Sequence, residues 1–157
     1  MKALLFTLLA VVGFQVQAQQ VPAHRVASQH EFTIRSSTLT GWVYYNCDSV
    51  EQTVTDLLSE LGAKNISVRC TGGIEYGRPP MDAYVDVSFD ALKLAAINDT
   101  DTVMANWTPL QIRSWDNCDL KSQILKNTQS GFSMTDVKVS SCSSSSSQFR
   151  ASLTTLF

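Results

Sequence analysis

The sequence contains little histidine, and this scarcity bears on whether the protein can be an enzyme. Only His24 and His30 occur among its 157 residues. Both lie in residues 19–31, which show little periodicity and are predicted to form a flexible N-terminal arm. Such an arm does not hold an imidazole within reach of a nucleophile. Because the patterns Gly-x-Ser-x-Gly and His-Glu-x-x-His are also missing, we predict a non-enzyme without catalytic residues.

The chain also lacks an excess of positive charge. It has 12 lysines and arginines against 14 aspartates and glutamates, and removal of an N-terminal signal containing Lys2 would leave it more acidic. A basic surface that attracts nucleic acid or anionic lipid is therefore not expected.

Patterns for metal ions are missing as well. No Cys-x-x-Cys, Cys/His cluster or EF-hand spacing is present. Asp82, Asp86 and Asp90 share one face of a predicted strand, but carboxylates four residues apart on a strand are about 13 Å apart, too far for one ion. We expect no cofactor and no metal.

The N-terminus carries an export pattern. Lys2 precedes an apolar run over residues 3–14, and Val16-Gln17-Ala18 resembles a small-residue cleavage site. The run is too short to span a bilayer. Residues 1–18 are therefore predicted to be a signal peptide, cleaved near Ala18, leaving a periplasmic or extracellular chain without a transmembrane segment.

Four cysteines in an exported chain predict two disulfides. Four cysteines allow three pairings. The repeat described next favours Cys47 with Cys70 and Cys118 with Cys142, because in a β-α-β unit the start of the helix and the end of the following strand lie at the same edge of the sheet. The chain-entropy model assigns each bond about 3 kcal/mol.

The triplet Asn46-Cys47-Asp48 recurs as Asn117-Cys118-Asp119, 71 positions later (118 − 47). Each copy opens a helix-like stretch and continues to a second cysteine. We predict an α+β domain of two tandem duplicated β-α-β-β units, residues 32–97 and 98–157, with helices packed on a mainly antiparallel sheet. The predicted strands are 39–46, 66–70 and 84–92 in the first unit, and 103–116, 137–139 and 148–156 in the second.

The first helix has a clear apolar stripe, spaced i, i+4, i+7, i+8 and i+11: Val50, Val54, Leu57, Leu58 and Leu61. Asp48 and Glu51 resemble a capping box, and Gly62 provides a left-handed stop. In the second unit, Leu120, Ile124 and Thr128 repeat the spacing and Gly131 ends the helix.

Three aromatic residues flank the cysteine motifs: Trp42, Tyr44 and Trp115. Their phase places them on the sheet face opposite the sulfur atoms. If helices or the other unit cover this face they are core residues, which is the usual place for aromatic strand residues. If it is open, they form a patch suited to a protein or glycan partner.

Residues 74–81 are predicted to form a loop beside a predicted disulfide, and in it Tyr76 and Arg78 lie between a glycine pair and a proline pair. Tyr76 and Arg78 in this loop are residue types enriched in binding hot spots. The loop is either a recognition element or a solvated hairpin tip.

These features favour a small exported, disulfide-stabilised binding or accessory protein. One alternative is a structural subunit of an envelope or secreted assembly that adds a strand to a partner's sheet. Another is a small hydrolase that works through carboxylates such as Asp82 or Asp86.

Overall fold

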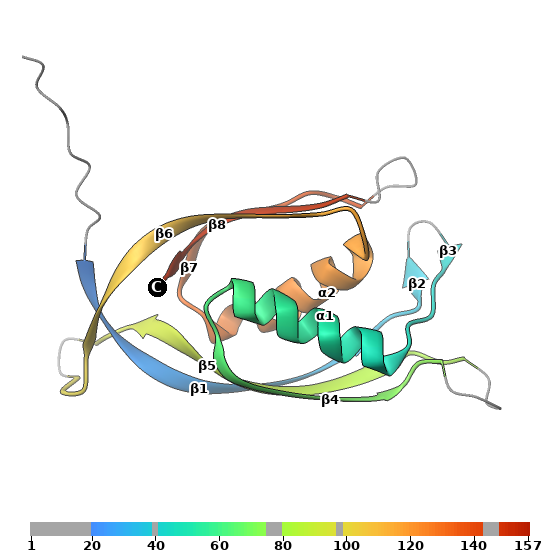
Figure 1. Ribbon diagram of the computed structural model, residues 1–157, viewed down its shortest axis with the longest axis horizontal. Coiled ribbons are helices and arrows are strands. Elements are labelled where there is room, and N and C mark those ends of the chain that lie inside the picture. The colour runs from blue at the N-terminus through green and yellow to red at the C-terminus, as the bar shows by residue number, and fades with distance from the viewer. Residues whose placement is uncertain (1–19, 39–40, 75–79, 97–98, 143–147) are drawn as a thin grey trace, which may run out of the picture.

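The computed structural model describes residues 20–38, 41–74, 80–96, 99–142 and 148–157 (Figure 1). The predicted signal peptide lies outside these residues. No helix in the described ranges has the length and apolarity needed to cross a membrane.

Six strands form one mainly antiparallel sheet in the order β4-β5-β1-β6-β8-β7. Their bounds are β1 (Gln20–Ile34), β4 (Lys64–Gly72), β5 (Ala83–Leu94), β6 (Val103–Ser114), β7 (Met134–Val139) and β8 (Phe149–Leu156), and a separate small ribbon contains β2 (Ser37–Thr38) and β3 (Gly41–Trp42). With two helices on this sheet, the α+β class is confirmed.

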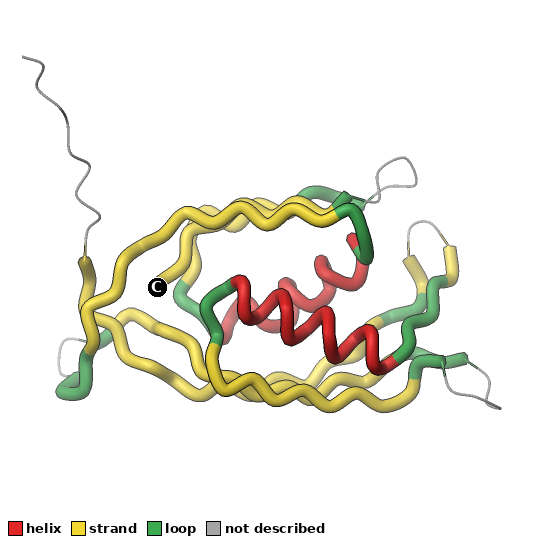
Figure 2. The backbone as a smooth tube through the Cα atoms, in the orientation of Figure 1, coloured by secondary structure: helices red, strands yellow, loops and turns green. Residues whose placement is uncertain are grey.

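The sheet consists of two halves, β4-β5-β1 and β6-β8-β7. They are joined where Gln20–Ala23 of β1 pair with Val103–Asn106 of β6. The two halves face each other and enclose the helices α1 (Cys47–Glu60) and α2 (Cys118–Thr128), as Figures 1 and 2 show. A short 3-10 turn, η1 (Gln129–Gly131), follows α2.

The predicted helix stripes are confirmed. All five stripe residues of α1 are buried, as are Leu120, Ile124 and Thr128 of α2. The two helices contact each other, α1 also packs on β4, and α2 packs on β1 and β8. The buried residues of both halves therefore form one continuous main core.

Both predicted disulfides are confirmed. Cys47 is bonded to Cys70 and Cys118 to Cys142, with Cα–Cα distances of 5.4 and 5.8 Å. Each bond ties the first residue of a helix to the end of β4 or to the segment that follows β7. The starts of the helices are thereby held against the ends of the strands that follow them.

The predicted capping box is wrong. The N-cap of α1 is Asn46, whose side chain accepts a hydrogen bond from Asp48 N (2.8 Å). The helix begins earlier than expected, so Asp48 lies in its first turn and Glu51 is free to turn toward the sheet. Glu51 Oε1 accepts from Cys70 N on the outer edge of β4 (2.8 Å). Gly62 does stop the helix, with φ of +87°.

The predicted flexible arm over residues 19–31 is also wrong for the part that the structure describes, because Gln20–Ile34 form the long strand β1 inside the sheet. The side chains of Ser28 and His30 fall in the inward-facing series, between Val26 and Phe32, and interrupt its apolar pattern. Of the strand predicted at 39–46, the described residues form only the short strand β3 (Gly41–Trp42), and residues 43–46 have no regular secondary structure. Residues 39–40 lie outside the described ranges.

A tightly packed aromatic cluster lies beneath the end of α2. The ring of His30 stacks on Phe89 at 5.6 Å between centroids, and Phe89 stacks on Phe132 at 4.9 Å. A Cβ added to Gly131 would lie 2.5 Å from Phe89 Cζ and 3.0 Å from His30 Nε2. Gly131 is therefore required for close packing rather than for a left-handed backbone.

We expect Gly131→Ala to lower stability by about 1–3 kcal/mol, the usual cost of overpacking a core. The reduced entropy of the unfolded chain offsets at most about 1 kcal/mol of this. Urea unfolding measures the change, with Ser130→Ala as the control because Ser130 is exposed in the same turn. Equal stability of the two variants would contradict the packing argument.

Burial of the ring, and secondly the positive charge of Lys93, lower the pKa of His30 below its ordinary value of 6.5. Between the lowered pKa and the ordinary one, the unfolded chain binds more protons at this histidine than the folded chain does. The free energy of unfolding is therefore unaffected by His30 above pH 6.5, and it decreases as the pH falls from there toward the lowered pKa. Between about pH 7.5 and about pH 5.5 the thermal midpoint should decrease in the wild type and decrease less in His30→Gln. Identical pH profiles would show that His30 does not titrate with unfolding.

Candidate functional site

One end of the molecule gathers the segments that surround the two cysteine motifs. The β2–β3 ribbon, the start of α1 and the turn from β6 into α2 all lie at the right-hand end of Figure 1. The strands β4 and β7 end there as well. Since the helices begin and these strands end together, the disulfides support this loop-bearing end directly.

Two tryptophans stand in solvent at the loop-bearing end. The exposed fractions are 73% for Trp42 and 77% for Trp115. Burial, the location favoured for these residues, is therefore wrong for both. Trp42 lies in the small ribbon and Trp115 in the turn after β6, so neither side chain is on the sheet face that the helices cover.

The ring of Trp42 is ordered by its neighbour. It stacks on the half-buried Tyr44 with 6.3 Å between centroids and 19° between ring planes. The pair therefore presents a flat aromatic surface. Tyr76 and Arg78, the other candidate binding residues, lie outside the described residues.

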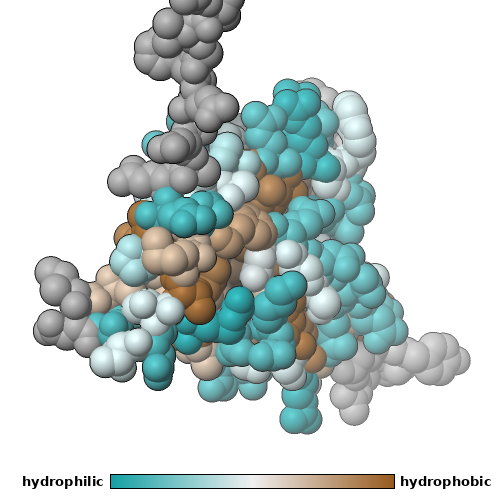
Figure 3. All heavy atoms as spheres, turned by 60° about the vertical axis from the view of Figure 1, so that its left-hand side comes forward, coloured by the Kyte–Doolittle hydropathy of each residue, from teal (hydrophilic) through white to brown (hydrophobic). Residues whose placement is uncertain are grey.

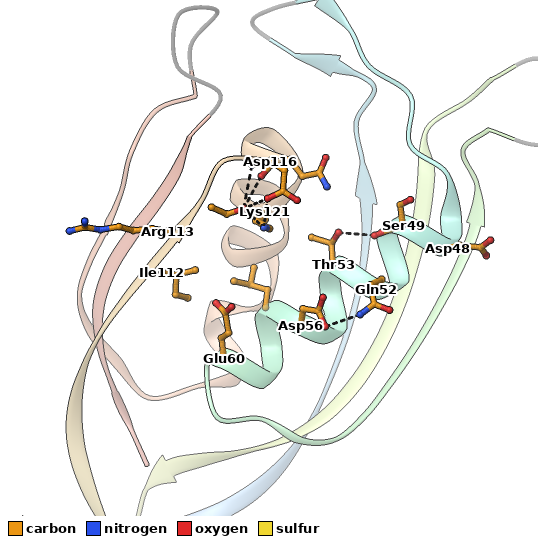
Figure 4. A pocket seen from close by; sticks show the side chains of 13 residues that line it. Asp48, Ser49, Gln52, Thr53, Asp56, Glu60, Ile112, Arg113, Asp116 and Lys121 are labelled. Carbon is orange, nitrogen blue, oxygen red and sulfur yellow. Dashed lines mark hydrogen bonds and ion pairs between the residues drawn. The ribbon is translucent and has the colours of Figure 1, made fainter.

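A polar cleft of about 460 Å³ opens between α1 and the β6–α2 turn (Figure 4). On one side it is lined by the solvent-facing ridge of α1, in which every fourth residue is polar: Asp48, Gln52, Asp56 and Glu60. Ser114, Asp116, Asn117 and Lys121 line the other side. Because Ser114 and Asp116 flank Trp115, the cleft is continuous with the loop-bearing end.

A small polar network closes one side of the cleft. Lys121 Nζ lies 2.5 Å from Ser114 Oγ and 3.1 Å from Asp116 Oδ1, and Ser114 Oγ also donates to Asp116. The hydrogen bond from Ser114, followed by that from Lys121, lowers the pKa of Asp116 below its usual 3.8. Lys121 Nζ donates to Ser114 Oγ in this network, and Ser114 Oγ donates to Asp116, so the geometry does not make Lys121 a base toward Ser114. The network instead ties the first turn of α2 to the end of β6.

The carboxylates considered for a hydrolase do not gather at one place. Asp82 Oδ1 accepts from both N and Oγ of Ser36, at 2.7 and 2.5 Å. These bonds lower the pKa of Asp82, which opposes a role as a general acid. Asp86 faces solvent on the outside of β5 and accepts from Gln29 (3.3 Å), in a surface hollow that does not include Asp82.

Both histidines are held in place, contrary to expectation, because both belong to β1. His24 Nδ1 lies 3.1 Å from Asp99 Oδ2, and His30 is stacked in the core. In the described part of the chain, no hydroxyl or thiol is hydrogen-bonded to either ring, and no three His, Cys, Asp or Glu side chains gather to hold a metal ion.

The opposite end of the molecule, where β1 joins β6, exposes apolar side chains. Figure 3 brings this end forward and shows apolar residues beside polar ones. The large exposed residues here are Leu94, Val103, Met104 and Phe157. Phe157 also covers Gly62, where an added Cβ would lie 2.8 Å from its ring.

Comparison with protein-family models, curated proteins and solved structures found no match to this chain. The function is therefore argued from the arrangement of its own residues. Of the candidate binding residues, Trp42, Tyr44 and Trp115 lie at the loop-bearing end, while the polar ridge of α1 and the Ser114–Asp116–Lys121 network were not recognised in the sequence. A ridge with four-residue spacing is visible there, but the turn that brings Lys121 to Ser114 is not.

We expect Asp116→Asn to weaken the attachment of α2 to β6. Because Asp116 is largely exposed, the loss at neutral pH should be below about 1 kcal/mol. Since the folded pKa is lowered, the contribution of Asp116 is present above pH 3.8 and is lost as pH falls below it. Urea unfolding at neutral and acidic pH tests this, with Asp101→Asn as the exposed control; a loss that persists in strong acid would contradict the ionic argument.

Proposed function

We propose that the protein is a small exported, non-catalytic binding or accessory protein that contacts a protein or glycan through its loop-bearing end. The observation that carries this proposal is the exposure of Trp42 and Trp115 on the same end. The cleft beside them adds polar groups that can fix the orientation of a ligand.

Leaving an indole in water forgoes stability. Burying an aromatic side chain removes about 150–250 Å² from solvent, and apolar area contributes about 25 cal/mol per Å². At about three-quarters exposure each tryptophan therefore leaves roughly 3–5 kcal/mol of possible stabilisation unused, a large amount for a small domain. Stacking of Trp42 on Tyr44 also lowers the entropy lost when the ring is immobilised by a partner.

The export pattern of residues 1–18 supports a periplasmic or extracellular location after cleavage near Ala18. The two disulfides are compatible with an oxidising compartment.

We also propose that the two halves arose by tandem duplication, with the first unit starting at β1 rather than at residue 32. The strand order is equivalent in the halves, β4-β5-β1 and β7-β8-β6. Asn65 and Asp136, 71 positions apart (136 − 65), both have positive φ, 51° and 55°, and both lie at a bulge in an edge strand. This offset equals that between the two Asn-Cys-Asp triplets.

A structural subunit that grows by strand addition is the second candidate. The same bulges disfavour it, because they bend the edge strands β4 and β7. In addition, the backbone N–H of Cys70 at the β4 edge donates to Glu51, so it is not available to pair with an added strand. A carboxylate-dependent hydrolase ranks third, because Asp82 and Asp86 do not converge.

A pull-down from the native exported fraction tests the proposal, using residues 19–157 as bait. We expect the double variant Trp42→Ala/Trp115→Ala to lose partner binding by about thirtyfold, as for a hot spot worth 2 kcal/mol. Tyr84→Ala is the matched control, since Tyr84 is 56% exposed on the outer face of β5. A Tyr76→Ala/Arg78→Ala variant tests the neighbouring loop.

Unchanged capture by a folded double tryptophan variant would contradict the proposal. An immobilised glycan panel run with the same variants separates a glycan from a protein partner. Elution of the mature chain as a large oligomer would favour the structural subunit instead.

A further inference from the structure

The outer face of the half-sheet β6-β8-β7, which points away from the helices, carries a group of positive charges. A hollow of about 370 Å³ lies on this face. Among the described residues that line it, every charged one is basic. Its polar lining side chains are Gln111, Arg113, Lys138, Ser140, Arg150 and Ser152.

The strand register sets these residues in two rows across the sheet. In the first row Arg113 of β6 pairs directly with Arg150 of β8. Ser140, just after β7, lies on the other side of Arg150, because Ser140 N donates to Arg150 O (2.8 Å). In the second row, Gln111 pairs with Ser152, which in turn pairs with Lys138. The two guanidinium groups and the ammonium group therefore project from neighbouring positions on one face.

The opposition of Arg113 and Arg150 is unfavourable for the isolated fold. Side chains directly opposite on an antiparallel pair have Cβ atoms about 5 Å apart, and like charges there repel. Carboxylates would be the stabilising choice at either position. The equivalent outer face of the first half has such a pair, since Arg69 lies opposite Asp86.

Neutral side chains hold both guanidinium groups. Arg113 Nη2 donates to Gln111 Oε1 (3.0 Å), and Arg150 Nε donates to the buried Gln148 Oε1 (2.6 Å). Within the described residues neither arginine forms an ion pair. Arg113 is among the residues that line the polar cleft, but Figure 4 shows its guanidinium group pointing away from the acidic ridge of α1. The arginines are thus oriented while their charge remains uncompensated.

We propose that this outer face, which adjoins the loop-bearing end, is a binding site for a phosphate-bearing ligand. Arginine forks match the geometry of phosphate oxygens, and the hydroxyl of Ser152 and the side-chain amide of Gln111 supply further donors, whereas Ser140 Oγ accepts from Arg150 N (3.0 Å). The bound phosphate relieves the repulsion between Arg113 and Arg150. The near-neutral charge of the whole chain conceals this local cluster.

Titration of the mature protein with inorganic pyrophosphate at constant ionic strength tests the site, followed by NMR shifts of the amides of β6, β7 and β8. We expect saturable shifts confined to this face and a loss of affinity of at least about tenfold in Arg113→Gln. Arg69→Gln, an exposed arginine on the other half-sheet, should bind as the wild type does. Vesicles of phosphatidylglycerol and phosphatidylcholine form a second arm.

Binding of pyrophosphate alone assigns a soluble ligand, whereas vesicle binding that pyrophosphate competes away assigns a lipid headgroup. Arg113→Glu provides a readout that misfolding cannot imitate. It places a carboxylate opposite Arg150, so the thermal midpoint should stay equal or rise while phosphate binding is lost. Absence of binding in both arms, or equal binding by wild type and Arg113→Glu, would overturn the proposal.

Discussion

The shared core between the two half-sheets is the constraint on which the rest of the structure depends. Among the described residues, four pairs between β1 and β6 join the halves of the sheet. They remain face to face because α1 and α2 bury their apolar stripes between them and against each other. The polar ridge of α1 lies outside this core, and the cleft forms where the second half leaves that ridge uncovered.

Several features of the surface reduce stability without serving the core. Two indoles stand in solvent, and two arginines oppose each other on one sheet face. Natural sequences depart from local stability rules mainly at functional sites. The edge strands β4 and β7, in contrast, carry features that prevent association. Their bulges, and the hydrogen bond from Cys70 N to Glu51, protect the sheet against pairing with another chain. The molecule therefore limits association at its edges and exposes recognition groups on other surfaces.

Local patterns in the sequence predicted the elements whose signals are local. The stripe of α1, the strand that became β5 and the cysteine pairing all follow from spacing. The strand β1 was missed because Ser28 and His30 occupy inward positions that a pattern search expects to be apolar. Trp42 is exposed because its segment forms the small β2–β3 ribbon instead of a strand of the six-stranded sheet. The opposition of Arg113 and Arg150 depends on strand register. Both depend on which strands pair in the folded molecule, and no spacing along the chain reveals them.

The central position of β1 also determines the order of assembly. This strand is synthesised before the other described strands, yet its partner in β5 comes 49 (83 − 34) to 71 (94 − 23) positions later. Closing such long loops costs conformational entropy before the β1–β5 hydrogen bonds can form. A fold with so many contacts between residues far apart in the sequence is expected to fold slowly. β1 therefore stays without its β5 partner until residues 83–94 have been made, and the native sheet closes around the earliest of the described strands.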